Sequence, residues 1–135
     1  MAKSQTILIT GILGQDGSYL AKHALELGHT VIGGIRGEAD SDRTWRLKHL
    51  GIVEDVRFVP FDLVDPASID DAIRGTAPDI IFNFAAQSSV GESFTHPVAT
   101  AEAGGIGAVR IFEHARACGN GIRVFQASSS EIFGD

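Results

Sequence analysis

The sequence has little of what marks several large classes of protein. Its single cysteine, Cys118, cannot form an internal disulfide. The 5 histidines have no metal-ligand spacing with that cysteine, so we expect no bound metal. No apolar run approaches the length needed to cross a bilayer, and the first residues lack the pattern of a signal peptide. We therefore expect a cytoplasmic protein with no membrane partner.

An excess of basic charge is also missing. The chain has 11 Lys and Arg residues against 17 Asp and Glu residues, and its net charge is −6. The basic residues are scattered rather than gathered into a stripe, which argues against nucleic acid as a partner. With 135 residues and no repeat or linker, residues 1–135 are expected to form one domain with a continuous core.

Glycine is abundant, and three glycines are regularly spaced near the N-terminus. Gly11, Gly14 and Gly17 follow an apolar run at 6–10 and lead into an amphipathic segment at 18–27. Glycine at such positions allows a sharp turn, close approach of a pyrophosphate and tight packing of a helix on a strand. The N-terminus of the helix adds unpaired N–H groups. The pattern predicts a dinucleotide site; the alternative is a purely structural turn.

The rest of the chain alternates between strand-like and helix-like segments. Further strands are predicted at 29–35, 56–61, 80–86 and 122–127, further helices at 44–50, from 66 onward and at 98–117, and polar loops at 37–43 and 87–97. This alternation favours right-handed crossovers and a parallel sheet with helices on both faces. We predict a doubly wound, Rossmann-type α/β fold with strand order 3-2-1-4-5. Its ligand should bind beyond the carboxyl ends of the strands, near the point where the order reverses.

Two of the predicted helices contain a group of residues with two possible roles or an unusual composition: a pair of aspartates and a cluster of glycines. Asp70 and Asp71 are interpreted as part of a solvated helical face rather than as a metal or acid pair. Gly104, Gly105 and Gly107 weaken the first half of the helix predicted at 98–117 and indicate a close approach to another element.

Arg36 ends the second predicted strand, about twenty residues beyond the glycine turn, where dinucleotide domains recognise the adenosine ribose. A guanidinium at this position favours NADP, because it can donate two hydrogen bonds to a 2′-phosphate. Glu38 and Asp40 keep NAD open as the alternative, since an acid would bind the 2′-hydroxyl.

Three further strand ends carry candidate site residues. Asp62 is predicted to accept a hydrogen bond from the adenine amino group, with Leu63 against the ring; the alternative is a cap for the next helix. Ala85 and Ala86 are small enough for a cofactor to approach the backbone, or for a tightly packed crossover. Three serines and Glu131 follow a buried strand at 128–131. One interpretation is that the hydroxyls bind a substrate oxygen and the carboxylate moves a proton. The alternative is that the serines cap the next turn and the Glu131 side chain is solvated.

Three segments together give a more specific resemblance. Residues 10–20, 84–88 and 126–134 are similar to motifs of the GDP-mannose 4,6-dehydratases, which are extended short-chain dehydrogenase/reductases, and the run Gln-Asp-Gly-Ser-Tyr at 15–19 is that family's form of the loop. The resemblance covers nearly the whole chain. It implies tightly held NADP, cofactor contacts from Gln15, Asp16 and Gln87, and a nucleotide-sugar contact from Ser88.

The resemblance also implies a lyase reaction on GDP-mannose without net redox change. A hydride leaves C4 of the hexose, water is eliminated across C5 and C6, and the hydride returns to C6. Ser129 stands where the family has a threonine that assists the C4 hydroxyl, and Glu131 would be the acid/base at C5.

The sequence departs from the family pattern at three points. Ser89 replaces a histidine, Gly104 replaces a polar Asp or Asn, and no Tyr-x-x-x-Lys pair follows Glu131; the only tyrosine, Tyr19, belongs to the first helix. We expect the chain to stop before the sheet and the substrate-binding region are complete. It should then be inactive alone and form homo-oligomers through exposed apolar surface.

Two alternative functions remain open from the sequence. One is a nucleotide-sugar epimerase or reductase of the same superfamily, and the other is a non-catalytic NAD(P)-binding module.

Overall fold

The computed structural model describes residues 3–87, 89–129 and 133. In chain order its elements are β1 (Thr6–Thr10), α1 (Gln15–Glu26), β2 (Thr30–Ile35), α2 (Trp45–His49), a 3₁₀ turn (Val53–Asp55), β3 (Val56–Pro60), α3 (Pro66–Thr76), β4 (Ile80–Asn83), α4 (Val90–Thr95), α5 (Pro97–Ala101), a π-helical turn (Glu102–Ile106), α6 (Gly107–Cys118) and β5 (Arg123–Gln126). Among the described helices, none has both the length and the apolar character needed to span a membrane.

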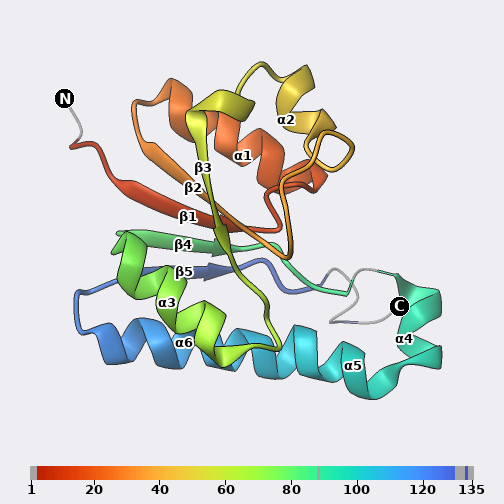
Figure 1. Ribbon diagram of the computed structural model, residues 1–135. Helices are drawn as coiled ribbons and strands as arrows, with labels where there is room; N and C mark the ends of the chain where they lie inside the picture. The colour runs from red at the N-terminus through yellow and green to blue at the C-terminus, as the bar shows by residue number, and fades with distance from the viewer. Residues whose placement is uncertain (1–2, 88, 130–132, 134–135) are drawn as a thin grey trace.

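The strands form one parallel sheet in the order β3-β2-β1-β4-β5, as predicted. Figure 1 shows α1 and α2 on one face of the sheet and α3 and α6 on the other. Because the order reverses between β1 and β4, the connections after these two strands diverge at the carboxyl edge and leave a crevice between them.

Alternating side chains of the buried strands supply two cores. Ile7 and Ile9 of β1 pack in the cluster that includes α1 and α2, whereas Leu8 packs with α3 and α6. This period of two is what a strand covered on both faces requires. It explains why the central strands are apolar almost without interruption.

Residues 87–97, predicted as a polar loop, instead contain the helix α4. Ser89 is its N-cap, and the Ser89 hydroxyl accepts a hydrogen bond of 3.3 Å from the backbone N–H of Glu92. Ser and Glu three residues apart form the sequence signature of a capping box. The signal was therefore present in a segment whose polar composition suggested a loop.

The helix predicted at 98–117 is divided into α5, the π-helical turn and α6. The close approach expected of its glycines occurs at Gly107, where an added Cβ would lie 2.8 Å from Leu63 Cβ. Apart from the chain neighbours and the backbone of the same helix, no atom of the described residues lies within 4 Å of a Cβ added at Gly104 or Gly105, so the expectation is wrong at these two positions. Arg110 joins α6 to the same connection by donating to the Leu63 carbonyl at 2.9 Å.

The start of α3 agrees with the prediction that Asp65 caps a helix beginning at Pro66. The Asp65 carboxylate accepts a hydrogen bond of 3.0 Å from the Ala67 N–H. β4 is shorter than predicted, because it ends at Asn83 and the chain then turns into the site.

The helices α3 and α6 are joined by polar side chains at their surface. Asp70 accepts hydrogen bonds from Arg74 at 2.8 Å and 2.9 Å, and its Oδ1 lies 3.1 Å from Nδ1 of His114. These contacts, with Arg74 the larger cause, hold the pKa of the Asp70 carboxyl below its ordinary value of 3.8. Asp70 is therefore part of an interhelix contact rather than only a solvated face. Within residues 3–87, 89–129 and 133, no three His, Cys, Asp or Glu side chains are grouped to hold a metal ion.

The Asp70 contact predicts a pH-dependent contribution to stability. A lowered pKa favours the charged form in the folded state, so the contribution is present above the unfolded-state pKa and is lost as pH falls through the folded-state pKa. Asp70→Asn should therefore be less stable than wild type at neutral pH, and the difference should disappear as the pH falls through the lowered folded-state pKa of Asp70. Urea unfolding across this range measures it. The matched control is Asp71→Asn, and equal effects of the two variants at neutral pH would contradict the assignment.

Candidate functional site

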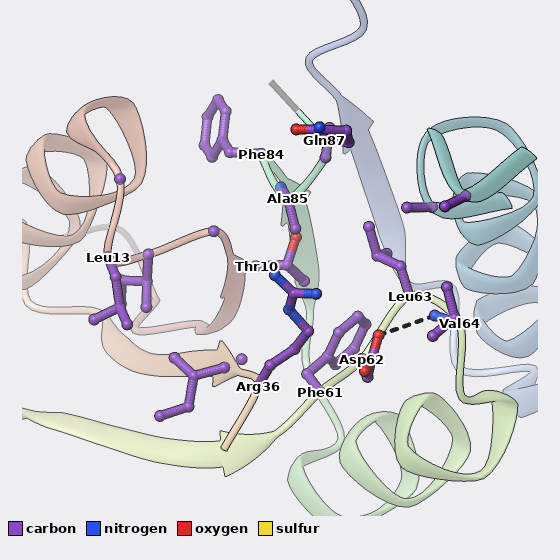
Figure 2. A pocket seen from close by; sticks show the side chains of 18 of the residues that line it. Thr10, Leu13, Arg36, Phe61, Asp62, Leu63, Val64, Phe84, Ala85 and Gln87 are labelled. Carbon is purple, nitrogen blue, oxygen red and sulfur yellow. Dashed lines mark hydrogen bonds between the residues drawn. The ribbon is translucent and has the colours of Figure 1, made fainter. Parts of the chain in front are cut away.

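A pocket of about 650 Å³ opens at the carboxyl edge of the sheet, where the strand order reverses. Figure 2 shows the side chains that surround it. Its walls come from the turn after β1, the ends of β2 and β4, the connection after β3, and the helices α4 and α5. Ligand sites of small molecules commonly have this size. The pocket lies where the sequence predicts the ligand.

The turn after β1 is built on two glycines that cannot be replaced without a clash. Gly11 has φ +69, and a Cβ added to it would lie 2.7 Å from the Phe84 carbonyl carbon. A Cβ on Gly17 would lie 2.4 Å from the Gly11 carbonyl oxygen. Gly11 therefore allows the turn to pack against the end of β4, and Gly17 allows α1 to pack against the turn.

Gly14 lines the pocket and is the N-cap of α1. Within the described residues this N-cap makes no side-chain hydrogen bond, which leaves the N–H groups of the first turn of α1 available as donors for an anion beside Gly14. Gln15 and Asp16 are exposed in that turn and are not among the described lining residues. Their predicted cofactor contacts stay predictions.

Two arginines line the end of the pocket near β2. Arg36 extends from the end of β2 toward the pocket (Figure 2). Arg43 reaches back from the following loop, and its Nη1 donates to the carbonyl oxygens of Arg36 at 2.5 Å and Glu38 at 2.7 Å. Arg43 was missed by the sequence analysis, because a long side chain that returns to a strand end leaves no local pattern.

The two acids that favour NAD as the alternative cofactor are placed differently from the two arginines. Glu38 and Asp40 are exposed and are not among the described lining residues of the pocket. The Asp40 carboxylate accepts the backbone N–H of Arg43 at 2.9 Å. This contact folds the loop around the second arginine.

Asp62 and Leu63, in the connection after β3, also line the pocket. The Asp62 carboxylate accepts a hydrogen bond of 3.1 Å from the Val64 N–H, drawn as the dashed line in Figure 2. The cap of α3 is Asp65, so the alternative role of Asp62 as the cap of that helix is wrong. Asp62 instead shapes the connection after β3 and presents its carboxylate at the pocket. Its predicted contact with adenine stays a prediction.

The end of β4 forms the floor of the pocket. Ala85 and Ala86 line it, and the Ala85 N–H donates to Thr10 Oγ1 at 3.3 Å. Gln87 also lines the pocket; its Nε2 donates to the Glu92 carboxylate, and its Oε1 accepts the Ser89 N–H at 3.0 Å. Hydrogen bonds at both of its ends therefore fix the segment after Asn83 along the pocket.

The wall made by α4 and α5 is not predicted from the sequence, because the polar composition of this segment favours a loop. This wall contributes Glu92, His96, Ala99 and Thr100. The capping-box signal at 89–92 was the feature that predicts it.

The structure describes only some of the predicted catalytic and substrate-binding residues. Ser129 is exposed just beyond β5 and is not among the described lining residues of the pocket. The residue before it, Ser128, has φ +62. Ser88 and Glu131 lie outside the described residues, so their predicted roles stay predictions.

Comparison with known proteins assigns the family. The family model described as GDP-mannose 4,6 dehydratase matches residues 8–135. The chain belongs to the GDP-mannose 4,6-dehydratase family. It is 38% identical to GDP-mannose 4,6 dehydratase of Homo sapiens over 99% of this chain, and 40% identical to GDP-mannose 4,6-dehydratase of Vibrio cholerae serotype O1 over 94% of this chain. It spans only 38% and 36% of the length of these two relatives.

Solved structures confirm the fold of this family member. UDP-glucose-4-epimerase of Stenotrophomonas maltophila, determined with bound NAD and formylated UDP-arabinopyranose, has a TM-score of 0.81 at 23% identity over 97% of this chain and 39% of its own. UDP-glucose 4-epimerase of Thermus thermophilus, in complex with NAD, has a TM-score of 0.71 at 26% identity over 84% of this chain and 34% of its own. The Rossmann-type fold predicted from the sequence is thus confirmed.

Proposed function

We propose that the chain is the NADP-binding part of a nucleotide-sugar 4,6-dehydratase that converts GDP-mannose to GDP-4-keto-6-deoxymannose. The observation that carries this proposal is the convergence of four separately predicted segments on one pocket. The Gly11 turn, Arg36, the Asp62–Leu63 pair and the Ala85–Ala86 pair all line it. The match to the family over residues 8–135 supports the reaction.

The residues of the pocket fit a dinucleotide phosphate. The turn from Gly11 to Gly14 and the first turn of α1 would hold the pyrophosphate through backbone N–H groups. Arg36 would pair with the 2′-phosphate, with Arg43 beside it, and two guanidinium groups favour NADP over NAD. Asp62 and Leu63 would hold the adenine.

The bound cofactor would supply hydride transfer, taking a hydride from C4 of the hexose and returning it to C6. Ser129 would donate a hydrogen bond to the C4 oxygen and orient that hydroxyl. Glu131 would move the proton at C5, since a carboxylate beside the sugar can act as base and then as acid during elimination of water. Gln87 and Ser88 would position the cofactor and the nucleotide sugar.

The 135 residues of this chain contain one tyrosine, Tyr19, which lies in α1. We propose that the chain alone binds the cofactor but does not turn over GDP-mannose, because no Tyr-x-x-x-Lys pair is present to remove the C4 hydroxyl proton. The homo-oligomeric state and the cytoplasmic location expected from the sequence stay predictions.

Replacing Glu131 by glutamine in the full-length natural protein tests the reaction. A dehydratase should lose formation of the 4-keto-6-deoxy sugar by at least about 100-fold, as removal of a general acid/base does, and should retain NADPH affinity. An epimerase or reductase of the same superfamily would tolerate the change. Product analysis by mass spectrometry after incubation with GDP-mannose distinguishes them, and unchanged turnover in Glu131→Gln would refute the assigned role.

A further inference from the structure

A row of polar side chains crosses three strands inside the sheet, just beneath the site. Thr10, Asn83 and Gln126 are register partners at the carboxyl ends of β1, β4 and β5. The Thr10 hydroxyl donates to Asn83 Oδ1 at 2.5 Å, and Asn83 Nδ2 donates to Gln126 Oε1 at 2.7 Å. Thr10 is 0% exposed and Asn83 is 1% exposed.

The two hydrogen bonds that join the side chains of this polar row run in one direction, from β1 to β5. The Thr10 hydroxyl donates a hydrogen bond to Asn83 Oδ1, and its oxygen accepts a hydrogen bond from the Ala85 N–H at 3.3 Å. The Asn83 amide uses its oxygen toward β1 and its nitrogen toward β5. Replacing one member by an apolar residue would leave its neighbour unsatisfied in a buried place, which is costly.

The polar row lies at the carboxyl ends of β1, β4 and β5, three of the strands whose ends lead into the site. Thr10 precedes the Gly11 turn, Asn83 precedes the segment that forms the pocket floor, and Gln126 stands three residues before Ser129. The row therefore links the phosphate-binding turn to the strand that delivers the predicted catalytic hydroxyl. Apolar side chains would pack the sheet equally well but would not set a fixed register of donors and acceptors across it.

The backbone after Gln126 takes a conformation that serine rarely adopts. Ser128 has φ +62, in the left-handed region. Such a residue is strained unless its surroundings determine it, and strained residues cluster at functional sites. This left-handed residue immediately precedes Ser129.

We propose that Thr10, Asn83 and Gln126 are positioning residues. They fix the carboxyl end of β5 against the glycine turn, and through the left-handed Ser128 they set Ser129 relative to the cofactor pocket. This proposal rests on the proposed function for its kinetic consequence. Its structural consequence, an ordered β5 end that depends on Gln126, holds independently of the reaction.

The test compares Gln126→Leu with Gln126→Glu in the full-length natural protein. Leucine removes the acceptor for Asn83 Nδ2, whereas glutamate restores it. Gln126→Leu should lower kcat by about 10- to 100-fold, because a small displacement of a reacting group has that effect, while KM and NADPH affinity stay near wild type. Gln126→Glu should recover most of kcat. Equal kcat in both variants, or a parallel loss of NADPH affinity, would overturn the proposal.

Amide hydrogen exchange gives a readout that does not require turnover. In Gln126→Leu the amides of residues 126–129 should exchange about 10-fold faster or more than in wild type, with the Thr6–Thr10 strand less affected. Unchanged exchange at the end of β5 would overturn the proposal even in an active enzyme. If the wild-type protein fails to act on GDP-mannose, and the amides at the end of β5 still exchange faster in Gln126→Leu than in wild type, only the proposed function is refuted.

A second pair of variants tests the left-handed turn. Ser128→Gly keeps the positive φ without strain and should retain kcat. Ser128→Val cannot adopt that conformation cheaply, because its Cβ is branched, and should lose kcat to about the same extent as Gln126→Leu. Equal activity of the two Ser128 variants would contradict a role for the turn in positioning Ser129.

Discussion

Gly11→Ala is expected to weaken NADPH binding by about 100-fold. The methyl group would lie 2.7 Å from the Phe84 carbonyl carbon and 2.8 Å from the Ala85 nitrogen, both of them backbone atoms of the pocket floor. The φ of +69 adds strain for any residue with a Cβ. Neither the turn nor the floor can move away without changing the pocket. Isothermal titration of wild type and variant with NADPH measures the loss.

Two other glycines separate the causes of that loss. Gly28 has φ +80 but nothing within 4 Å of an added Cβ, so Gly28→Ala carries the strain without the clash. Gly104 has an open position without a positive φ, so Gly104→Ala should be neutral or slightly stabilising. Both controls should bind NADPH as wild type does. A Gly11→Ala protein that folds and binds NADPH normally would show that the turn does not hold the cofactor.

The second large effect concerns the choice of cofactor. Arg36→Ala should reduce NADPH affinity by roughly 10- to 100-fold, the effect expected for lost charge-assisted hydrogen bonds to a phosphate. NADH affinity should change little, because NADH has no 2′-phosphate. Parallel titrations with the two nucleotides measure the ratio of the affinities.

Arg57→Ala is the matched control for Arg36, since Arg57 is an exposed arginine on β3 and does not line the pocket around Gly11. It should leave both affinities unchanged. If wild type binds NADPH and NADH equally, or if Arg36→Ala weakens both alike, the assignment of Arg36 to the 2′-phosphate is wrong.

The parts of the fold that follow local rules were predictable from the sequence. The Asp65 cap followed by Pro66, and the glycine turn between an apolar run and a helix, each carry a signal within a few residues. The strand order follows from the alternation of elements and from the handedness of crossovers. These rules also place the pocket at the reversal of strand order, where the structure has it.

The parts that depend on packing between distant residues were not predictable in the same way. Arg43 lines the pocket because the loop folds back on Arg36, and the polar row exists because the register places Asn83 opposite both Thr10 and Gln126. In the sequence, Asn83 interrupts an apolar run by one residue, and no single-strand pattern names its partners. Such contacts depend on three strands at once.

The helix α4 was missed for a different reason. Its signal was local, since Ser89 and Glu92 have capping-box spacing, but the helix has only six residues and its polar composition matches a loop. The error concealed the wall of the pocket that carries Glu92 and His96.

A crystal structure of the full-length natural protein grown with NADPH tests most directly whether the pocket around Gly11 holds NADP. We expect the pyrophosphate within hydrogen-bonding distance of the backbone N–H groups at the start of α1, and the 2′-phosphate beside Arg36. Clear density for the cofactor elsewhere on the protein, or a cofactor in the pocket with its 2′-phosphate away from Arg36, would contradict it.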